Sequence, residues 1–261
     1  VSIGAIACGL NGWWKGTEAM KAIDVANPQV VIADKKRFER IADLIQHPAV
    51  IVEELNLRDY DHELDSFIRV DEDECACLLY TSGTTGTPKG VMTSHRSMIA
   101  NSTLSMLQGA AVSQDSSAHG IDWSENTPTS LLTSPLFHVS GLSAGVVTSL
   151  FAGSTTLVYE GRFLPEKVLE LITKYNVTSW GGAVPTALKR VLDAAETKNL
   201  YLPSVLVVGG GGAPMPPKLI ERTKDVFPNS KYSFGYGYGL TESGAITIIN
   251  WGENLINEPS S

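Results

Sequence analysis

Residues 78–90 read LLYTSGTTGTPKG, an apolar run followed by a loop of glycine and hydroxyl-bearing residues that ends near one lysine. The apolar residues are typical of the end of a buried strand. Glycine lets a backbone approach an anion closely, hydroxyl groups add donors beside the backbone N–H groups, and a lysine supplies a mobile positive charge. This composition predicts a binding site for a triphosphate, with the ligands Thr81, Ser82, Gly83, Thr84, Thr85, Gly86, Thr87 and Lys89.

The loop differs from the Walker A phosphate loop. That motif needs a glycine immediately before its lysine and a serine or threonine after it, whereas Pro88 precedes Lys89 and Gly90 follows it. A flexible surface turn is the alternative for any segment rich in glycine, serine and threonine. The segments further along the chain decide between these two interpretations.

Four segments in series resemble the adenylate-forming superfamily, which includes acyl-CoA synthetases, luciferase-like ligases and the adenylation domains of peptide synthetases. TSGTTGTPKG at 81–90 resembles its phosphate loop, and SPLFHVSG at 134–141 resembles its second core segment. LVVGGGGAP at 206–214 resembles the strand and glycine turn that lie along the adenine, and YGYGLTES at 236–243 resembles the segment that holds adenine, phosphate and magnesium. The order and spacing of the four segments are those of the superfamily.

The resemblance implies a role for each matched residue. Lys89 with the loop hydroxyls would hold the β- and γ-phosphates of ATP, Thr241 would contact the α-phosphate, and Glu242 would hold Mg²⁺. Tyr238 would lie against the adenine ring, and the backbone around the nucleotide would come from Gly211, Gly212, Ala213 and Gly239. Without this context, the Thr-Glu pair would be interpreted as a helix cap or a solvated surface pair.

The resemblance places His138 beside the substrate carboxylate and implies that its side chain changes position between reaction stages. The alternative is a histidine that is simply hydrogen-bonded in the core or at the surface. Of the two chemical roles, neutral hydrogen bonding is favoured over proton transfer. The predicted catalytic residues are therefore Lys89, His138, Thr241 and Glu242.

The predicted function is ATP-dependent activation of a carboxylic acid, with a fatty acid favoured, to an acyl-adenylate and pyrophosphate. A carboxylate with a pKa near that of glutamate is already ionised at pH 7, so the reaction needs alignment and charge neutralisation rather than a general base. CoA is the expected second substrate. The resemblance places the acyl pocket at residues 180–186, WGGAVPT, with the helix after Gly141. Two alternatives stay open, an adenylation module of a peptide synthetase and a non-catalytic nucleotide-binding remnant.

The fold class is α/β, with layered sheets flanked by helices, because apolar strands alternate with amphipathic helices. The resemblance implies part of a large N-terminal domain over residues 1–261, truncated at both ends, without the small C-terminal domain and incomplete for catalysis. Strands are predicted at 30–33, 49–52, 76–80, 130–133, 155–158, 177–180, 205–208 and 232–234. Helices are predicted at 17–26, 35–46, 94–107, 165–175, 186–197 and 216–226, and an exposed loop at 113–129.

Composition excludes some classes of partner. The net charge of -8 argues against a nucleic-acid backbone as the main partner. No stretch approaches the roughly 18 consecutive apolar residues of a membrane span, and the resemblance implies a cytoplasmic protein, with peripheral membrane association left open. Three cysteines, an odd number, are expected to be reduced and packed in the core. The oligomeric state is not predicted.

Overall fold

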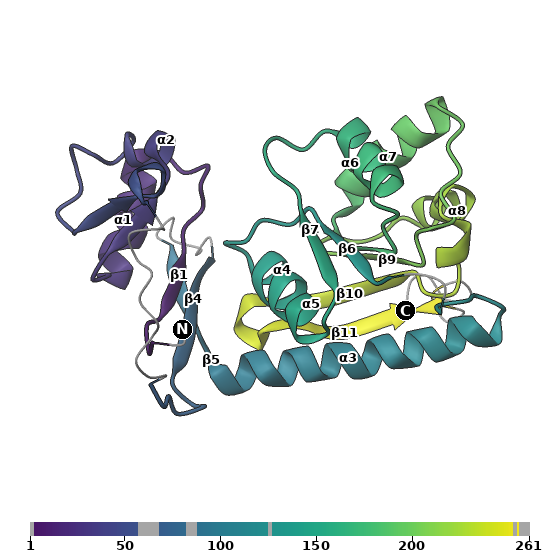
Figure 1. The fold of residues 1–261 in the computed structure, drawn as a ribbon, viewed down its shortest axis with the longest axis horizontal. Coiled ribbons are helices and arrows are strands. Elements are labelled where there is room, and N and C mark those ends of the chain that lie inside the picture. Colours follow the sequence, from purple (N-terminus) through teal and green to yellow (C-terminus); the bar gives the residue numbers. More distant parts are fainter. Residues whose placement is uncertain (1–2, 57–67, 82–87, 125–126, 253–254, 256–261) are drawn as a thin grey trace. The chain divides into compact units, whose positions relative to one another are not determined.

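The computed structural model describes residues 3–56, 68–81, 88–124, 127–252 and 255. Its elements are labelled in Figure 1. The chain divides into two compact units, Val1–Ser97 and Met98–Ser261. No helix within the described ranges has the length and apolar character needed to cross a membrane.

The N-terminal unit contains a three-stranded sheet and a separate strand pair. In the sheet, β1 (Ala7–Gly9) runs parallel to β4 (Cys75–Thr81), which pairs with the antiparallel β5 (Lys89–Ser94). The pair consists of the parallel strands β2 (Val31–Ala33) and β3 (Ala49–Ile51). Ile23, Val31 and Ile41 form a small buried cluster. The helices are α1 (Gly16–Ala26), α2 (Lys35–Phe38) and the short 3-10 helix η1 (Val52–Glu54).

The C-terminal unit is built on a six-stranded sheet with the order β11-β10-β9-β8-β6-β7. Its first five strands in chain order run parallel to their neighbours, and β11 is antiparallel to β10. The strands are β6 (Thr129–Leu132), β7 (Thr155–Val158), β8 (Ser179–Ala183), β9 (Val207–Gly211), β10 (Gly235–Leu240) and β11 (Ala245–Trp251). Parallel pairing brings the carboxyl ends of β6 to β10 to one edge of the sheet.

Three helices pack against one another and form the main core with the sheet. They are α6 (Pro165–Lys174), α7 (Pro185–Thr197) and α8 (Pro217–Val226), and each begins with a proline, which is pre-organised for the first helical position. Val168, Leu188 and Ile220 of these helices are buried with Trp180 and Val208 of the strands. The core therefore lies between the sheet and this helical layer.

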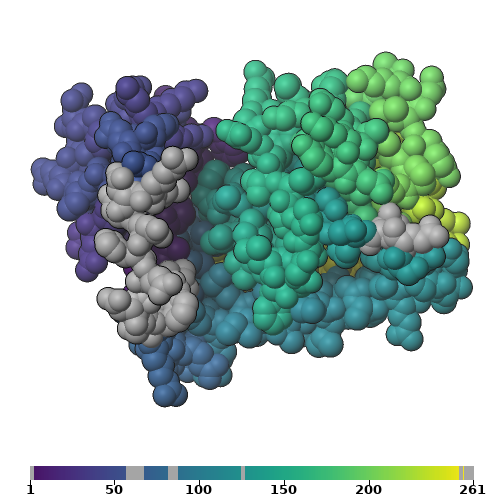
Figure 2. Space-filling view, in the orientation of Figure 1, coloured from purple at the N-terminus to yellow at the C-terminus, as the bar shows by residue number. Residues whose placement is uncertain are grey.

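The chain between β6 and β7 is helical and lies on the other face of the sheet from α6, α7 and α8. The connection from β6 to β7 runs in one direction along the sheet and the connections from β7 to β10 run in the other, and right-handed crossovers in opposite directions use opposite faces. The helical segment consists of α4 (Val139–Gly141), the π-helix η3 (Leu142–Val147) and α5 (Thr148–Phe151). Figure 2 shows this segment, in teal-green, at the surface of the face turned toward the viewer. Thr148 lies 3.4 Å, oxygen to oxygen, from Ser102 of the long helix α3 (His95–Ala118), which Figure 1 shows beside β11.

The predicted α/β class is confirmed, and three local predictions are wrong. The helix predicted at 35–46 ends at Phe38, because the chain continues in tight turns such as Ile41 N to Phe38 O, 2.9 Å. The strand predicted at 232–234 is a turn, and β10 begins at Gly235. Helix α3 continues into the predicted loop, because the buried Ser116 hydroxyl donates to Val112 O at 2.8 Å and accepts from Trp123 Nε1 at 2.9 Å.

Strands β1, β5 and β11 were not among the predicted strands. Each depends on a partner strand rather than on a long apolar run: β1 has three residues, and every described pair of β11 is with β10. The three cysteines are free, with Cys77 buried and Cys8 and Cys75 partly buried, as predicted.

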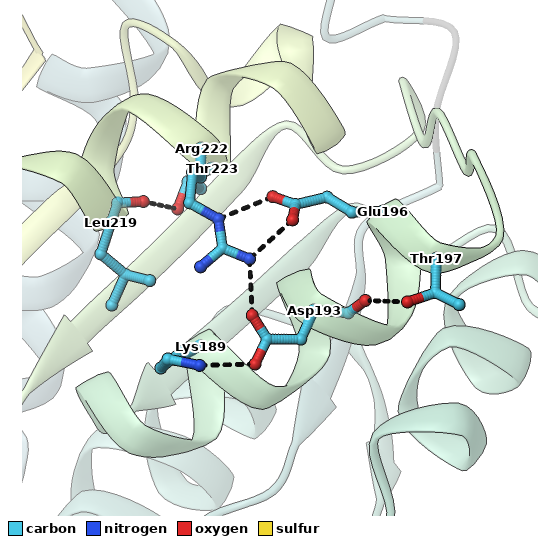
Figure 3. Close-up of polar contacts among 7 residues, drawn as sticks. All are labelled: Lys189, Asp193, Glu196, Thr197, Leu219, Arg222 and Thr223. Atoms are coloured by element: carbon cyan, nitrogen blue, oxygen red, sulfur yellow. Dashed lines mark hydrogen bonds and ion pairs between the residues drawn. The ribbon is translucent and has the colours of Figure 1, made fainter.

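An ion-pair network joins α7 to α8 (Figure 3). Arg222 of α8 donates through Nε to Glu196 Oε1 at 2.6 Å and through Nη2 to Asp193 Oδ1 at 2.7 Å. Lys189 Nζ donates to the other oxygen of Asp193, also at 2.6 Å. The Arg222 side chain is only 21% exposed. Because α7 follows β8 and α8 follows β9, this network holds together the helices that come after two neighbouring strands.

We expect Arg222→Met to lower the melting temperature at pH 7 and to have a much smaller effect near pH 3. The hydrogen bonds from Lys189 and Arg222 hold the pKa of Asp193 below its ordinary value. The contribution of the Asp193 carboxylate to the free energy of unfolding is complete above the unfolded-state pKa of about 3.9. It is lost as the pH falls through the lower folded-state pKa. Thermal unfolding followed by circular dichroism at both pH values tests this.

Lys189→Met is the matched control, because it removes one exposed pair within α7 and leaves the link between the helices. We expect it to lower the melting temperature less than Arg222→Met at pH 7. An Arg222→Met effect of equal size at both pH values would contradict the electrostatic explanation and assign the effect to packing of the arginine stem.

Candidate functional site

The carboxyl edge of the C-terminal sheet has the geometry of a ligand site. From β6 the chain moves outward to β7 and then returns past β6 to β8, so the strand order reverses between the neighbours β6 and β8. In open α/β sheets the crossovers that leave two such strands use opposite faces of the sheet. Ligands of open α/β sheets bind at this kind of position. The predicted SPLFHVSG segment follows β6, and the segments at 180–186, 206–214 and 236–243 include the carboxyl ends of β8, β9 and β10.

The glycine turn predicted to lie along the adenine follows β9. Gly211 pairs with Gly237 of β10, and a Cβ atom on Gly211 would lie 2.8 Å from the carbonyl oxygen of Gly237. Gly212 has φ +81°, a conformation that side chains disfavour. The hydroxyl of Tyr236 donates to the carbonyl oxygen of Ala213. The turn is therefore held on β10 from both its backbone and a side chain.

The Thr-Glu segment lies where β10 reverses into β11. A short 3-10 helix, η5 (Thr241–Ser243), makes the reversal, with Thr241 buried and Glu242 exposed. The Ser243 hydroxyl accepts from Leu240 N at 3.1 Å and lies 2.9 Å from Leu240 O, which fixes the turn internally. Tyr238, two residues before the end of β10, has an exposed side chain, which leaves its ring accessible to a planar ligand.

His138 lies on the loop after β6, at the reversal of strand order. Its Nδ1 accepts from Ser140 N at 3.2 Å and lies 2.9 Å from the Ser140 hydroxyl. Because Nδ1 is an acceptor, the neutral ring carries its proton on Nε2. His138 is exposed overall, and partial burial lowers the pKa of His138 below its ordinary value. We therefore expect a ring that is neutral at pH 7 and able to donate from Nε2.

Two side-chain hydrogen bonds connect the loop after β6 to β8. Trp180 Nε1 donates to Thr133 Oγ1 at 3.1 Å, and the Ser134 hydroxyl donates to Gly182 O at 3.1 Å. Gly181 has open space where a Cβ atom would be, whereas a Cβ on Gly182 would lie 2.6 Å from the Ser134 hydroxyl. The segment predicted as the acyl pocket is thus in direct contact with the loop that carries His138.

The described ends of the predicted phosphate loop lie in the N-terminal unit. Thr81 ends β4 and pairs with Lys89, which begins β5 and has an exposed side chain. Gly90 packs against Leu78, because a Cβ atom there would lie 2.9 Å from a methyl carbon of that leucine. The candidates Ser82, Gly83, Thr84, Thr85, Gly86 and Thr87 lie outside the described residues. The hairpin brings Thr81 and Lys89 together, and the other described candidates belong to the C-terminal unit.

The residues present fit a magnesium ion shared with a nucleotide. Within the ranges that the structure describes, no group of three or more His, Cys, Asp and Glu side chains is arranged to hold a metal. Magnesium in phosphate-transfer sites is commonly held by one or two carboxylates and by the substrate's phosphates. The exposed carboxylate of Glu242, next to Thr241, matches that mode of binding.

Two residues of this edge were not predicted as site residues, Tyr236 and Ser134. For Tyr236 a signal was available, because it alternates with Tyr238 in YGYG and residues two apart share one face of a strand. Ser134 is the first residue of the SPLFHVSG segment, but its bond to Gly182, 48 residues away in the chain, has no local signal.

Comparison with known proteins identifies relatives of the whole chain. The family model for AMP-binding enzymes matches residues 1–261. A 4-coumarate–CoA ligase of Pinus taeda is 28% identical over 258 residues, which cover 95% of this chain and 46% of that protein. A 4-coumarate–CoA ligase-like protein of Oryza sativa subsp. japonica is 39% identical over 178 residues, 68% of this chain and 29% of that protein. This chain therefore spans less than half the length of these two relatives.

Solved structures share the fold. The N-terminal domain of FACL13 from Mycobacterium tuberculosis superimposes with a TM-score of 0.78 at 26% identity, covering 98% of this chain and 62% of that one. o-Succinylbenzoate CoA synthetase from Bacillus subtilis, solved with ATP and magnesium, superimposes with a TM-score of 0.69 at 26% identity, covering 97% of this chain and 48% of that one. The fold is that of the N-terminal domain of these proteins.

We expect His138 to titrate with a midpoint below about 6.5, the ordinary value for histidine, because burial disfavours the charged ring. Histidine ring signals followed by NMR between pH 4 and pH 9 measure this midpoint. The signal that disappears in His138→Gln identifies the residue. A midpoint at or above 6.5 would contradict the neutral state at pH 7 and favour an ionised ring.

Proposed function

Because this chain belongs to the AMP-binding enzyme family, we propose that it supplies the nucleotide- and acid-binding region of a ligase. The ligase uses ATP to convert a carboxylic acid to an acyl-adenylate, releases pyrophosphate, and transfers the acyl group to CoA. The observation that carries this proposal is that SPLFHVSG, WGGAVPT, LVVGGGGAP and YGYGLTES lie at the carboxyl edge of one parallel sheet, where the strand order reverses, while the described ends of the phosphate loop lie in the N-terminal unit. Residues 1–261 are proposed to be part of the enzyme's large N-terminal domain.

The first step is displacement at the α-phosphate by an ionised carboxylate, so the protein's task is alignment and charge neutralisation. Lys89 would bind the β- and γ-phosphates that leave as pyrophosphate. The hydroxyl of Thr241 would donate to an α-phosphate oxygen, where charge increases in the transition state. Glu242 would hold Mg²⁺, which when bound neutralises phosphate oxygens. These positions agree with the buried Thr241 and the exposed Glu242 of η5.

The adenine would lie between the glycine turn after β9 and the ring of Tyr238. The small residues Gly211, Gly212 and Ala213 leave their backbone accessible there, and Gly239 continues that surface along β10. The bond from Tyr236 to Ala213 keeps the turn in place before the nucleotide arrives, which reduces the ordering cost of binding.

His138 would donate from Nε2 to the carboxylate of the acid. This assignment follows from the Ser140 N–H bond to Nδ1, which leaves the proton on the other ring nitrogen. A neutral donor orients the carboxylate without forming an ion pair that would lower its nucleophilicity. Partial burial keeps the ring in this state at pH 7.

We propose a fatty acid as the substrate, with an aromatic acid as the second candidate. The open space at Gly181 suits an apolar chain beside the loop that carries His138. The names of the relatives favour the second candidate, because two of them are 4-coumarate–CoA ligase and a protein like it. A cytoplasmic location is part of the proposal, and the partners are the acid, ATP and CoA.

The test of this function is pyrophosphate release from ATP in the presence of octanoate, palmitate, 4-coumarate, benzoate or single amino acids. It is measured on the 261-residue chain and on the longest natural form of the protein. Release with palmitate or octanoate supports the fatty-acid proposal, and release with 4-coumarate or benzoate supports the second candidate. Release only with amino acids would indicate an adenylation module of a peptide synthetase. No release with any acid, although ATP binds, would favour a nucleotide-binding remnant.

We expect Lys89→Ala to lower kcat/KM for ATP by about 10²-fold, since it removes one positioned donor from the leaving phosphates. Glu242→Gln should raise the magnesium concentration needed for half-maximal pyrophosphate release. The matched controls are Lys36→Ala on α2 and Glu221→Gln on α8, which change exposed residues with no predicted role in the site. Unchanged kinetics in both site variants would contradict the site assignment.

A further inference from the structure

The loop that carries His138 is held to β8 by very few contacts. The backbone pairing of β6 with β8 ends at Leu132 and Gly181. Beyond that pair, the described side-chain links between the loop and β8 are the bond from Trp180 to Thr133 and the bond from Ser134 to Gly182. The Ser134 link is the one nearer in sequence to His138. The position of this loop therefore depends on individual side chains rather than on the sheet ladder.

Ser134 binds β8 at an irregular point. The pairing of β8 with β9 shifts register between Trp180 and Ala183, and Gly182 has φ +72°. Such a bulge leaves backbone groups without a ladder partner. The Ser134 hydroxyl supplies a partner for the Gly182 carbonyl at 3.1 Å. A Cβ atom on Gly182 would lie 2.6 Å from that hydroxyl, so the two loops are in close contact here.

A short, constrained turn connects Ser134 to His138. Pro135 fixes its own φ, and His138 N donates back to Pro135 O at 3.1 Å. Leu142 N donates to His138 O at 2.9 Å, which attaches His138 to the helix that follows. Since four peptide bonds with one internal hydrogen bond separate the two residues, a displacement of Ser134 would be transmitted to the His138 ring.

We propose that Ser134 is a positioning residue, whose hydroxyl sets the distance between the His138 ring and the Gly181–Gly182 segment. This inference rests on the proposed function, in which His138 contacts the carboxylate and Gly181 lies beside the acyl chain. The hydrogen bond joins the loop that carries His138, which orients the carboxylate, to the Gly181–Gly182 segment, which lies beside the rest of the acid. Ser134 thereby couples the fit of the acid to the alignment of its reacting end, and it does not contact ATP.

The experiment compares Ser134→Ala, Ser134→Thr and the control Ser117→Ala in the longest natural form of the protein. Ser117 is an exposed serine on α3 in the same unit. We expect Ser134→Ala to lower kcat/KM for the acid about tenfold with an unchanged KM for ATP, because small misplacements of reacting groups are costly. Ser134→Thr, which keeps the hydroxyl, should restore most of the loss, and Ser117→Ala should match the wild type.

A second readout does not require catalysis. NMR of histidine-labelled protein reports the ring environment of His138, identified by His138→Gln. We expect Ser134→Ala to move the His138 signal and its titration midpoint, and Ser134→Thr to leave both near their wild-type values. Unchanged His138 signals in Ser134→Ala would overturn the proposal. So would equal losses for acid and ATP that Ser134→Thr fails to restore, because they indicate a general effect on folding.

The two proposals fail separately. A wild-type protein that releases no pyrophosphate with any acid contradicts the proposed function. The NMR comparison then still decides whether the Ser134 hydroxyl positions His138. Release by the wild type together with an unmoved His138 signal in Ser134→Ala contradicts only the role of Ser134.

Discussion

The right-handedness of parallel crossovers is the constraint on which the C-terminal unit depends. The connection from β6 to β7 and the connections from β7 to β10 run in opposite directions along the sheet, so they occupy opposite faces. The helical core of α6, α7 and α8 forms on one face, and the bent helix from Val139 to Phe151 forms on the other. The reversal of strand order at this edge is therefore a consequence of topology, and the loop after β6 meets β8 there through Ser134 and Gly182.

Backbone contacts at that edge explain why its residues are small. Gly211 lies against the carbonyl oxygen of Gly237, and Gly182 lies against the hydroxyl of Ser134. A Cβ atom at either glycine would be too close to that oxygen. The glycines that allow this close approach increase the conformational entropy that the chain loses on folding. They leave peptide groups facing the place where a nucleotide and an acid are proposed to bind. Rigidity comes instead from neighbouring side chains, such as Tyr236 on Ala213.

The polar and charged side chains of the C-terminal unit fall into two groups, those that stabilise the fold and those at the candidate site. Arg222, Asp193 and Glu196 satisfy one another between α7 and α8, on helices whose apolar sides form the core. Glu242 and Tyr238 are exposed at the carboxyl edge. His138 is kept neutral by burial rather than by an ionic partner. The ion-paired side chains thus connect α7 to α8, and the exposed side chains lie at the edge where ligand binding is proposed.

Sequence patterns determined the family, the α/β class and the elements whose signals are local. The apolar run of β4, the helical periodicity of α1, α6, α7 and α8, and the glycine-rich segments are all encoded within about ten residues. Such signals also predicted the residues of the proposed nucleotide site, although the positions 82–87 lie outside the described residues. These predictions needed no knowledge of which strands are neighbours.

Only the tertiary structure decided what depends on distant partners. Strands β1 and β11 are defined by the strands they pair with, and α3 extends to Ala118 because Trp123 and Val112 satisfy the buried Ser116 hydroxyl. The Ser134–Gly182 bond joins residues 48 positions apart, and the Tyr236–Ala213 bond joins residues 23 apart. A local pattern carries no information on such pairs, because chain topology determines which residues meet. The sequence by itself therefore predicted the candidate site residues, and the fold decided which distant residues hold them.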